Sequence, residues 1–239
     1  MIEIKGLKKT LDGTVILDGI DLKIEKNKTT VVIGESGCGK TVLLKHIIGF
    51  FKPDEGEIFF DGKRIDTLSW KDWNNLRRKM TMVFQNSALF DWLSVYDNVA
   101  LPLREQHDLP EKEIKKQVEE KLAMVGMSGQ EKRTPAELSF GMQKRVSLAR
   151  AMILNPEYIL YDEPTTGLDP IIANNIIGLF STFKKIYHTT SLIVSHDISI
   201  VFKIADKVAL MKDGSIIFQG SVEDLGKVEN SYIKKFISR

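Results

Sequence analysis

The residues that most clearly indicate chemistry form a glycine-rich segment that ends in a lysine and a threonine. Its members are Gly34, Glu35, Ser36, Gly37, Cys38, Gly39, Lys40 and Thr41. Glycines allow backbone N–H groups to turn toward phosphate oxygens, and a helix that starts here points its positive end at the same place. Lys40 adds a charge for terminal phosphates, and Thr41 offers a hydroxyl to Mg²⁺. This spacing predicts a site for a nucleoside triphosphate.

Two adjacent carboxylates, Asp162 and Glu163, follow the apolar run Tyr158 to Tyr161. Uncompensated buried charge is costly, so these residues would be poor core residues, whereas a metal ion and a water molecule would give each a partner. We expect Asp162 to hold the Mg²⁺ shell and Glu163 to polarise an attacking water. The alternative, a plain turn at the end of a strand before Pro164, would be credible only without Lys40.

The elements that must position these residues alternate between strands and helices. The apolar strand 29–33 runs into the glycine-rich turn and then a helix over 41–48, which is the context that the phosphate motif requires. Four further strands are predicted after this unit, over 158–161, 191–195, 208–211 and 216–218. A helix from Pro170 to about Tyr187 lies between the first two of them. This order predicts a mostly parallel sheet with helices on both faces.

Residues 2–24 and residues from about 86 to 154 have different sequence patterns. Residues 2–24 alternate apolar and polar types and predict short antiparallel strands, separated by turns at Asp12-Gly13 and at Asp18-Gly19. Residues from about 86 to 154 have a helical pattern, including a helix opened by Pro110. The charged residues of that helix are most simply a solvated face. The helical stretch therefore interrupts the parallel sheet as an insert.

The composition is that of a globular protein with no strong charge preference. The chain has 239 residues, 43% of them hydrophobic, and a net charge of +2, which gives no reason to expect nucleic acid as a partner. Cys38 is the one cysteine, so no internal disulfide forms and a reducing compartment is expected. We expect neither a secretory signal nor a membrane helix, so another subunit would span any membrane involved.

At six places the chain resembles the ATP-binding subunit of an ABC (ATP-binding cassette) transporter, over essentially its whole length. The matches are Walker A at 34–41, the Q-loop glutamine Gln85, the signature at 138–142, Walker B at 159–163, the D-loop residue Asp169 and the switch histidine His196. The resemblance implies an α/β P-loop NTPase with a mostly parallel core sheet, an N-terminal antiparallel β-subdomain and an inserted α-helical subdomain. It also implies one ABC ATPase domain over 1–239, with the helical subdomain at about 86–154 and a RecA-like core.

The same resemblance implies a homodimer that binds ATP and Mg²⁺. Ser139 and Gly141 would cap the γ-phosphate held by a second subunit, so that each copy completes the other's site. His196 would donate to the γ-phosphate as charge develops, and Gln85 would report metal and phosphate to the helical subdomain. Gln85, Thr41 and Asp162 would be the metal contacts, and Asp169 would lie at the nucleotide. The remaining histidines are expected to be incidental; they are His46, His107 and His188.

The chain departs from the family pattern at two places. The family usually stacks adenine on an aromatic residue after the first strand, and the nearest equivalent here is Leu11, so that adenine would have weaker apolar contact. The signature has Phe140 and Met142 where Gly and Gln are commoner. Ser139 and Gly141 remain, so the expected phosphate contacts remain with them.

A closer resemblance indicates the type of transporter. Residues 84–90, 95–104 and 161–171, with Met142, are similar to the ATPases of MCE-associated (Mla-type) phospholipid transporters. This resemblance implies a multi-spanning permease, a lipid-binding MCE protein across the membrane, and a peripheral location on the cytoplasmic face of the inner membrane. A small regulatory subunit at the helical insert is one further partner of this type. The ATPase of an amino-acid or osmoprotectant importer is the alternative, because such ATPases share much of the pattern.

Other classes of ATPase differ in features that the sequence displays. An ABC ATPase of DNA repair would have a long heptad insert between Walker A and the signature, which is absent here. A translation-type ABC protein would hold two cassettes in one chain. A regulator without turnover would be expected to lack Glu163 or His196, and both are present. Copurification with a membrane protein would separate a transporter from all three classes.

Overall fold

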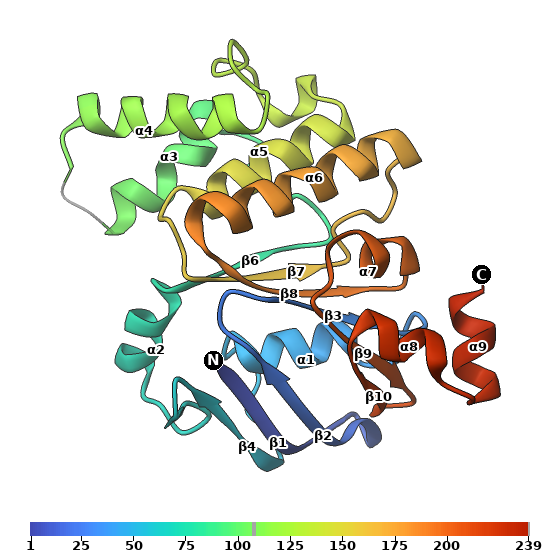
Figure 1. Cartoon of the computed structure of the whole chain (residues 1–239). Coiled ribbons are helices and arrows are strands. Elements are labelled where there is room, and N and C mark those ends of the chain that lie inside the picture. The colour runs from blue at the N-terminus through green and yellow to red at the C-terminus, as the bar shows by residue number, and fades with distance from the viewer. Residues whose placement is uncertain (107–108, 239) are drawn as a thin grey trace.

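The strands described in a computed structural model of the chain, which covers residues 1–106 and 109–238, form two sheets (Figure 1). The smaller sheet is antiparallel with the order β2-β1-β4-β5; its strands are β1 (Ile2–Leu11), β2 (Thr14–Ile24), β4 (Glu55–Phe60) and β5 (Lys63–Arg64). The larger sheet has the order β10-β9-β3-β8-β7-β6; its strands are β3 (Thr29–Ile33), β6 (Met80–Val83), β7 (Tyr158–Asp162), β8 (Thr190–Ser195), β9 (Lys207–Lys212) and β10 (Ser215–Gly220). Its neighbouring strands are parallel except for β9 and β10. The expected fold class is thereby confirmed.

Helices cover both faces of the larger sheet, as Figure 1 shows. Between β6 and β7 the chain forms α3 (Val95–Gln106), α4 (Glu111–Met124), a short 3₁₀ helix (Pro135–Glu137) and α5 (Phe140–Met152). The other described helices are α1 (Lys40–Ile47), α2 (Trp70–Arg77), α6 (Pro170–Tyr187), α7 (Ile198–Ile204), α8 (Val222–Lys227) and α9 (Ser231–Ile237). Within the described ranges, no helix has both the length and the apolar character needed to cross a bilayer.

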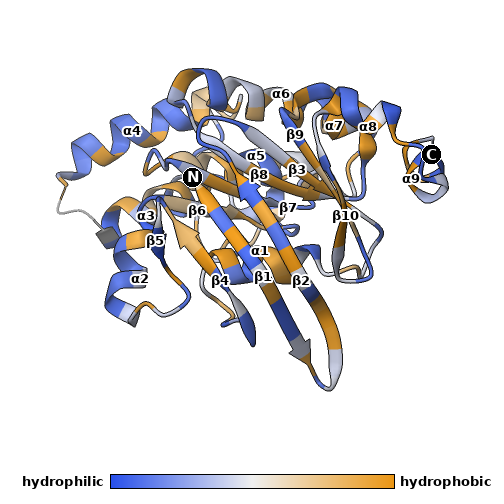
Figure 2. Ribbon diagram, turned by 60° about the horizontal axis from the view of Figure 1, so that its bottom comes forward, coloured by the Kyte–Doolittle hydropathy of each residue, from blue (hydrophilic) through white to orange (hydrophobic). Residues whose placement is uncertain are grey.

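Alternate residues of the central strands build two separate cores. In β3, Val31 and Ile33 pack with α5 and α6, whereas Val32 packs with α1 and the smaller sheet. In β7, Ile159 and Tyr161 belong to the first core and Leu160 to the second. Successive strand residues point to opposite faces, so a strand buried on both faces is apolar throughout. Figure 2 shows this contrast, with continuous hydrophobic runs in the central strands and alternating types along β1 and β2.

The predicted turn at Asp18-Gly19 is wrong, because β2 continues through these residues. The pairing of β1 with β2 shifts there, since Leu7 faces Ile20 whereas Lys9 faces Leu17. Gly19 has a φ of 68°, which a bulge can require and which glycine adopts without a steric penalty. The Asp18 N–H donates instead to the Gly214 carbonyl at 2.9 Å, in the turn between β9 and β10. The bulge therefore links the smaller sheet to the larger one.

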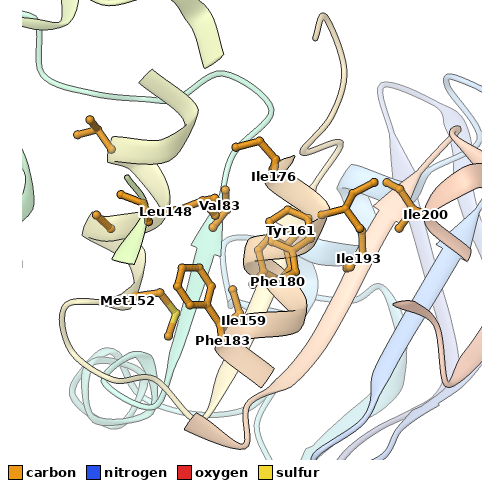
Figure 3. Packing of buried hydrophobic residues seen from close by; sticks show 14 of the residues in the cluster. Val83, Leu148, Met152, Ile159, Tyr161, Ile176, Phe180, Phe183, Ile193 and Ile200 are labelled. Atoms are coloured by element: carbon orange, nitrogen blue, oxygen red, sulfur yellow. The ribbon is translucent and has the colours of Figure 1, made fainter. Parts of the chain in front are cut away.

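In the first core, an aromatic side chain of β7 packs against one of α6. The rings of Tyr161 and Phe180 lie 4.3 Å apart between centroids, and Phe183 follows one turn along α6 (Figure 3). Phe183 is 1% exposed. The core therefore fixes the carboxyl end of β7, from which Asp162 and Glu163 emerge.

We predict that Phe183→Ala lowers the free energy of unfolding by about 3–5 kcal/mol, because it removes buried contacts and leaves a cavity. Denaturant unfolding of the nucleotide-free protein would measure this change. The matched control is Ile186→Ala on the same helix, where the side chain is 54% exposed and a change within about 0.5 kcal/mol is expected. Equal losses in both variants would contradict this packing account.

Candidate functional site

The glycine-rich loop connects the buried strand β3 to α1 and has little room for side chains. Gly39 has a φ of 104°, and a Cβ there would lie 2.8 Å from the Ile16 carbonyl oxygen. A Cβ at Gly34 would lie 2.4 Å from the Met211 carbonyl oxygen. Helix α1 has no acidic residue in its first turn, so its positive end is not neutralised by its own side chains. This arrangement suits an anion at the start of α1.

Lys40 holds a positive charge inside the loop. Its side chain is 5% exposed, and its Nζ donates to the carbonyl oxygens of Gly34 and Glu35, each at 2.9 Å. The same Nζ lies 3.3 Å from the Glu163 Oε1. The ammonium therefore joins the loop to the end of β7.

Thr41 and Asp162 place two oxygens side by side. The Thr41 Oγ1 donates to the Asp162 Oδ1 at 2.8 Å. Burial raises the pKa of the Asp162 carboxyl, and the neighbouring Glu163 raises it further, whereas the Thr41 hydrogen bond lowers it. A buried carboxylate beside a hydroxyl offers the hard oxygen ligands that Mg²⁺ prefers, and these residues fit that ion. In the described part of the chain, no group of three or more His, Cys, Asp or Glu side chains is placed to hold a metal ion.

Glu163 and His196 form a hydrogen-bonded pair at the ends of adjacent strands. The Glu163 Oε2 lies 2.8 Å from the His196 Nδ1, and it also accepts from the Thr166 Oγ1 at 3.2 Å and from the Ser195 Oγ at 3.4 Å. Glu163 is 8% exposed, whereas the His196 side chain is 47% exposed. Glu163 also has a φ of 45°, an uncommon conformation for a non-glycine residue that costs backbone energy. The carboxylate is thus tightly oriented, and the imidazole lies between it and solvent.

A pocket of about 410 Å³ brings most of the predicted residues together. Its lining includes Ser36, Gly37, Gly39, Lys40, Thr41, Gln85, Glu163 and His196. Glu35 and Cys38 line a neighbouring pocket, and burial raises the pKa of the Cys38 thiol. These residues come from four segments that are far apart in the chain, and they converge where strands of the larger sheet end.

The signature and D-loop residues do not line this pocket. Ser139 is exposed and caps α5 by accepting from the Met142 N–H at 3.3 Å. Gly141 is buried, and a Cβ there would lie 2.9 Å from the Ile172 side chain. Asp169 caps α6 by accepting from the N–H groups of Ile171 and Ile172, both at 3.0 Å. Within one protomer, therefore, Ser139 and Asp169 begin helices outside the lysine pocket.

Sequence reasoning missed three residues of this region. Ile16 and Thr166 line the pocket beside Lys40. Lys144 is 1% exposed, and its Nζ donates to the Gln85 carbonyl oxygen. Burial lowers the pKa of the Lys144 ammonium to about 8. The sequence signal that could have indicated the burial of Lys144 is its helical spacing, because it shares one face of α5 with the buried residues Ser147 and Leu148.

The expected adenine position near Leu11 is not supported by the described pockets. Leu11 pairs with Thr14 at the β1–β2 turn and lines neither pocket next to the glycine-rich loop. Ile16 lines both, and Val15 lines one and is 59% exposed. Leu11 was inferred only from its position along the chain, whereas the β1–β2 hairpin places it away from the pockets next to the glycine-rich loop. The apolar side chains next to the phosphate segment are those of Ile16 and Val15.

The other histidines lie outside the pocket or outside the described residues. His46 is buried on α1, where its Nδ1 lies 2.7 Å from the Val42 carbonyl oxygen. His188 is exposed and follows α6 with a φ of 51°. His107 lies outside the residues that the structure describes.

Comparison with known proteins identifies relatives that match nearly the whole of this chain. Residues 17–166 match the family model described as ABC transporter. The chain is 41% identical to the intermembrane phospholipid transport system ATP-binding protein MlaF of Haemophilus influenzae, over 99% of this chain and 90% of that protein. It is 38% identical to the probable ribonucleotide transport ATP-binding protein mkl of Mycobacterium tuberculosis, over 99% of this chain and 66% of that protein.

A solved structure has the same fold. It is the dimeric post-hydrolysis state of the ATP-binding cassette MJ0796 bound to ADP and Pi, with a TM-score of 0.85 and 29% identity. The match covers 93% of this chain and 99% of that chain. The likeness therefore extends over most of the chain.

Proposed function

Because this chain belongs to the ABC transporter family, in which it is an ATP-binding ATPase subunit, we propose that two copies close around two ATP molecules and drive a permease that moves phospholipid. The observation that carries the proposal is the 2.8 Å contact between Glu163 and His196 in the pocket of Lys40, with Ser139 outside that pocket. One protomer thus has the residues for hydrolysis but lacks the signature at its own site. A second copy would supply it.

In this proposal each pocket residue has a separate task. Lys40 binds the β- and γ-phosphates, which draws its ammonium away from Glu163. Glu163 then orients and polarises the water that attacks the γ-phosphorus, and the oxygen of the γ–β bridge leaves with ADP. His196 donates a hydrogen bond to the γ-phosphate as negative charge develops. The existing contact to Glu163 orients the imidazole for that donation.

Mg²⁺ would be held by Thr41 and Asp162, with Gln85 reaching it from the pocket wall. When bound, it neutralises charge on the phosphate oxygens. The protein's own contribution is a preformed pair of oxygens at the end of β7 and the start of α1. Ser139 and Gly141 would meet the γ-phosphate of the partner's ATP through a hydroxyl, backbone amides and the positive end of α5. Asp169 would lie at the same dimer interface.

A groove next to Gln85 supports the permease part of the proposal. It has a volume of about 390 Å³, and its lining combines apolar side chains with arginines; the lining residues include Met82, Phe84, Phe90, Leu101, Arg77 and Arg150. A helix of the permease would dock here, so that movement of the Gln85 segment reaches the membrane subunit. The cassette over 1–239 would act as one domain, with its helical subdomain at about 86–154 moving against the core.

The phospholipid substrate is proposed from the relatives. The Haemophilus protein is named for intermembrane phospholipid transport, and it shares the higher identity over nearly its full length. The mycobacterial relative is named for probable ribonucleotide transport and extends beyond this chain. We therefore infer a peripheral position on the cytoplasmic face of the inner membrane, with an MCE-type lipid-binding protein beyond the permease. A small regulatory subunit would bind the exposed face of the helical subdomain.

Purification of the chain from its own membranes would test this function. We expect a polytopic membrane protein to copurify in stoichiometric amount, and mass spectrometry of the complex to find bound phospholipid. Mg·ATP hydrolysis by that complex should exceed that of the isolated chain. Recovery of an amino-acid or nucleotide importer complex without bound lipid would contradict the phospholipid proposal.

A further inference from the structure

Lys144 is a buried cation whose contacts are all with uncharged groups. It lies in the second turn of α5, and its side chain is 1% exposed. Its Nζ donates to the Gln85 carbonyl oxygen and, at 3.5 Å, to the Phe84 carbonyl oxygen. It also lies 5.4 Å from the centroid of the Phe140 ring. Within residues 1–106 and 109–238, no carboxylate forms an ion pair with this ammonium.

Stability alone does not account for this lysine. Burying an ammonium costs free energy unless an opposite charge and further hydrogen bonds compensate it. Among the described residues, the hydrogen bonds of Lys144 go to neutral carbonyl oxygens, and Asp162 forms no ion pair with it. The lowered pKa of Lys144 has burial as its main cause, with Asp162 as a weaker opposing influence. An apolar side chain of similar length would fill the same space at a lower cost. The presence of an ammonium at this position is therefore better explained by the two segments that it connects, the Gln85 segment and α5.

Lys144 connects two segments that would contact different ATP molecules in the proposed dimer. Gln85 lines the pocket of its own protomer, beside Lys40 and Glu163. Helix α5 has Ser139 as its N-cap and Gly141 in its first turn, and both residues would contact the ATP bound by the partner. Lys144 therefore connects Gln85 of one ATP site to the helix whose Ser139 and Gly141 would contact the ATP of the other site.

Phe140 extends the same junction to the D-loop. A Cβ at Gly167 would lie 3.3 Å from the Phe140 ring, so the ring packs against the backbone between β7 and α6. The Phe140 ring also faces the Lys144 ammonium. Three segments of the interface thus meet around one buried side chain.

We propose that Lys144 is a positioning residue that couples the two ATP sites of the dimer, by tying the Gln85 backbone to the signature helix. This inference rests on the proposed dimeric function. Movement of Gln85 when nucleotide binds would shift α5 with it, and so change how Ser139 and Gly141 meet the partner's γ-phosphate. Hydrolysis at the two sites would then be cooperative because of this contact.

The test compares Lys144→Met with Lys144→Arg in the full-length protein. For Lys144→Met we expect ATP binding within about twofold of the parent, kcat reduced about tenfold or more, and a Hill coefficient that falls from above 1 to about 1. Its melting temperature should be unchanged or higher, because a poorly compensated charge is removed. Lys144→Arg should recover most of kcat and of the cooperativity, because a guanidinium can donate to both carbonyl oxygens.

Another buried lysine provides the matched control. Lys121 is 4% exposed, and its Nζ donates to the Asn155 Oδ1 at 2.7 Å and to the Tyr187 hydroxyl, away from the pocket. By the same argument as for Lys144, Lys121→Met should leave the melting temperature unchanged or higher, and it should also leave kcat and the Hill coefficient unchanged. A loss of activity that follows the melting temperature equally in both methionine variants would overturn the proposal.

A double-mutant cycle with Gln85→Ala tests whether Lys144 acts through Gln85. Since Lys144 contacts the backbone of residue 85, the side-chain change leaves that contact in place. We expect Lys144→Met to reduce kcat less than about twofold in the Gln85→Ala background, against tenfold in the parent. Full additivity, or a parent without cooperativity, would overturn the proposal. A parent that hydrolyses no ATP would instead contradict the function itself.

Discussion

Glu163→Gln is expected to slow ATP hydrolysis by about 10²–10⁴-fold while leaving ATP binding nearly unchanged. Glutamine has the shape of glutamate but cannot accept the proton of the attacking water, so the general-base contribution is lost. It also removes a negative charge 3.3 Å from the Lys40 ammonium, which favours phosphate binding at Lys40. Single-turnover hydrolysis and fluorescent-nucleotide titration of the same preparation would measure both effects.

The matched control for this variant is Glu157→Gln. Glu157 directly precedes β7, but its side chain is 52% exposed and forms a surface ion pair with Lys79 at 3.6 Å. Such pairs contribute little, so its hydrolysis rate should lie within about twofold of the parent. A Glu163→Gln protein that turns over ATP at the parent rate would remove Glu163 as the base.

His196→Ala is expected to slow hydrolysis by about 10²–10³-fold, the usual cost of losing one donor to a developing oxyanion. ATP affinity should stay within a few-fold, because Lys40 and the loop remain. Glu163 would keep its hydrogen bonds from Thr166 and Ser195, so the carboxylate stays oriented after the imidazole is removed. Rate and affinity measured together would separate this loss from weaker binding.

A histidine outside the pocket provides the control for His196→Ala. His188 follows α6 with a φ of 51°, so His188→Asn is the suitable change, since asparagine tolerates that conformation. Its turnover and affinity should match those of the parent. If His196→Ala also turned over at the parent rate, His196 would have no part in the mechanism.

Much of the fold could be predicted because local patterns and tertiary structure agree. The run 29–33 is apolar throughout, since β3 is buried on both faces, and the Gly-Lys-Thr sequence after it starts α1. The helix predicted from Pro170 to about Tyr187 is present as α6, because Asp169 caps it and Pro170 suits its first position. The convergence of Lys40, Glu163 and His196 followed from strands that are parallel and adjacent.

The remainder depended on contacts that sequence patterns do not encode. The bulge at Gly19 resembles a turn signal, and only its pairing with β1 distinguishes the two. Leu11 was suggested by order along the chain, whereas Ile16 faces the loop because of the hairpin's path. Helix α2 was not predicted, because its eight residues contain one buried side chain, Trp73, and give little periodicity. Lys144 was hidden because its partners are backbone carbonyls 59 and 60 residues away.

The central claim is that ATP joins two copies of this chain and that hydrolysis lets them separate. The most direct test is the mass of the Glu163→Gln protein in solution with saturating Mg·ATP, measured by light scattering, because turnover is then blocked. The account predicts twice the 27.1 kDa of one chain with Mg·ATP and a return to the monomer with ADP. A protein that keeps the mass of one chain under saturating Mg·ATP, even when its permease is present, would contradict the account.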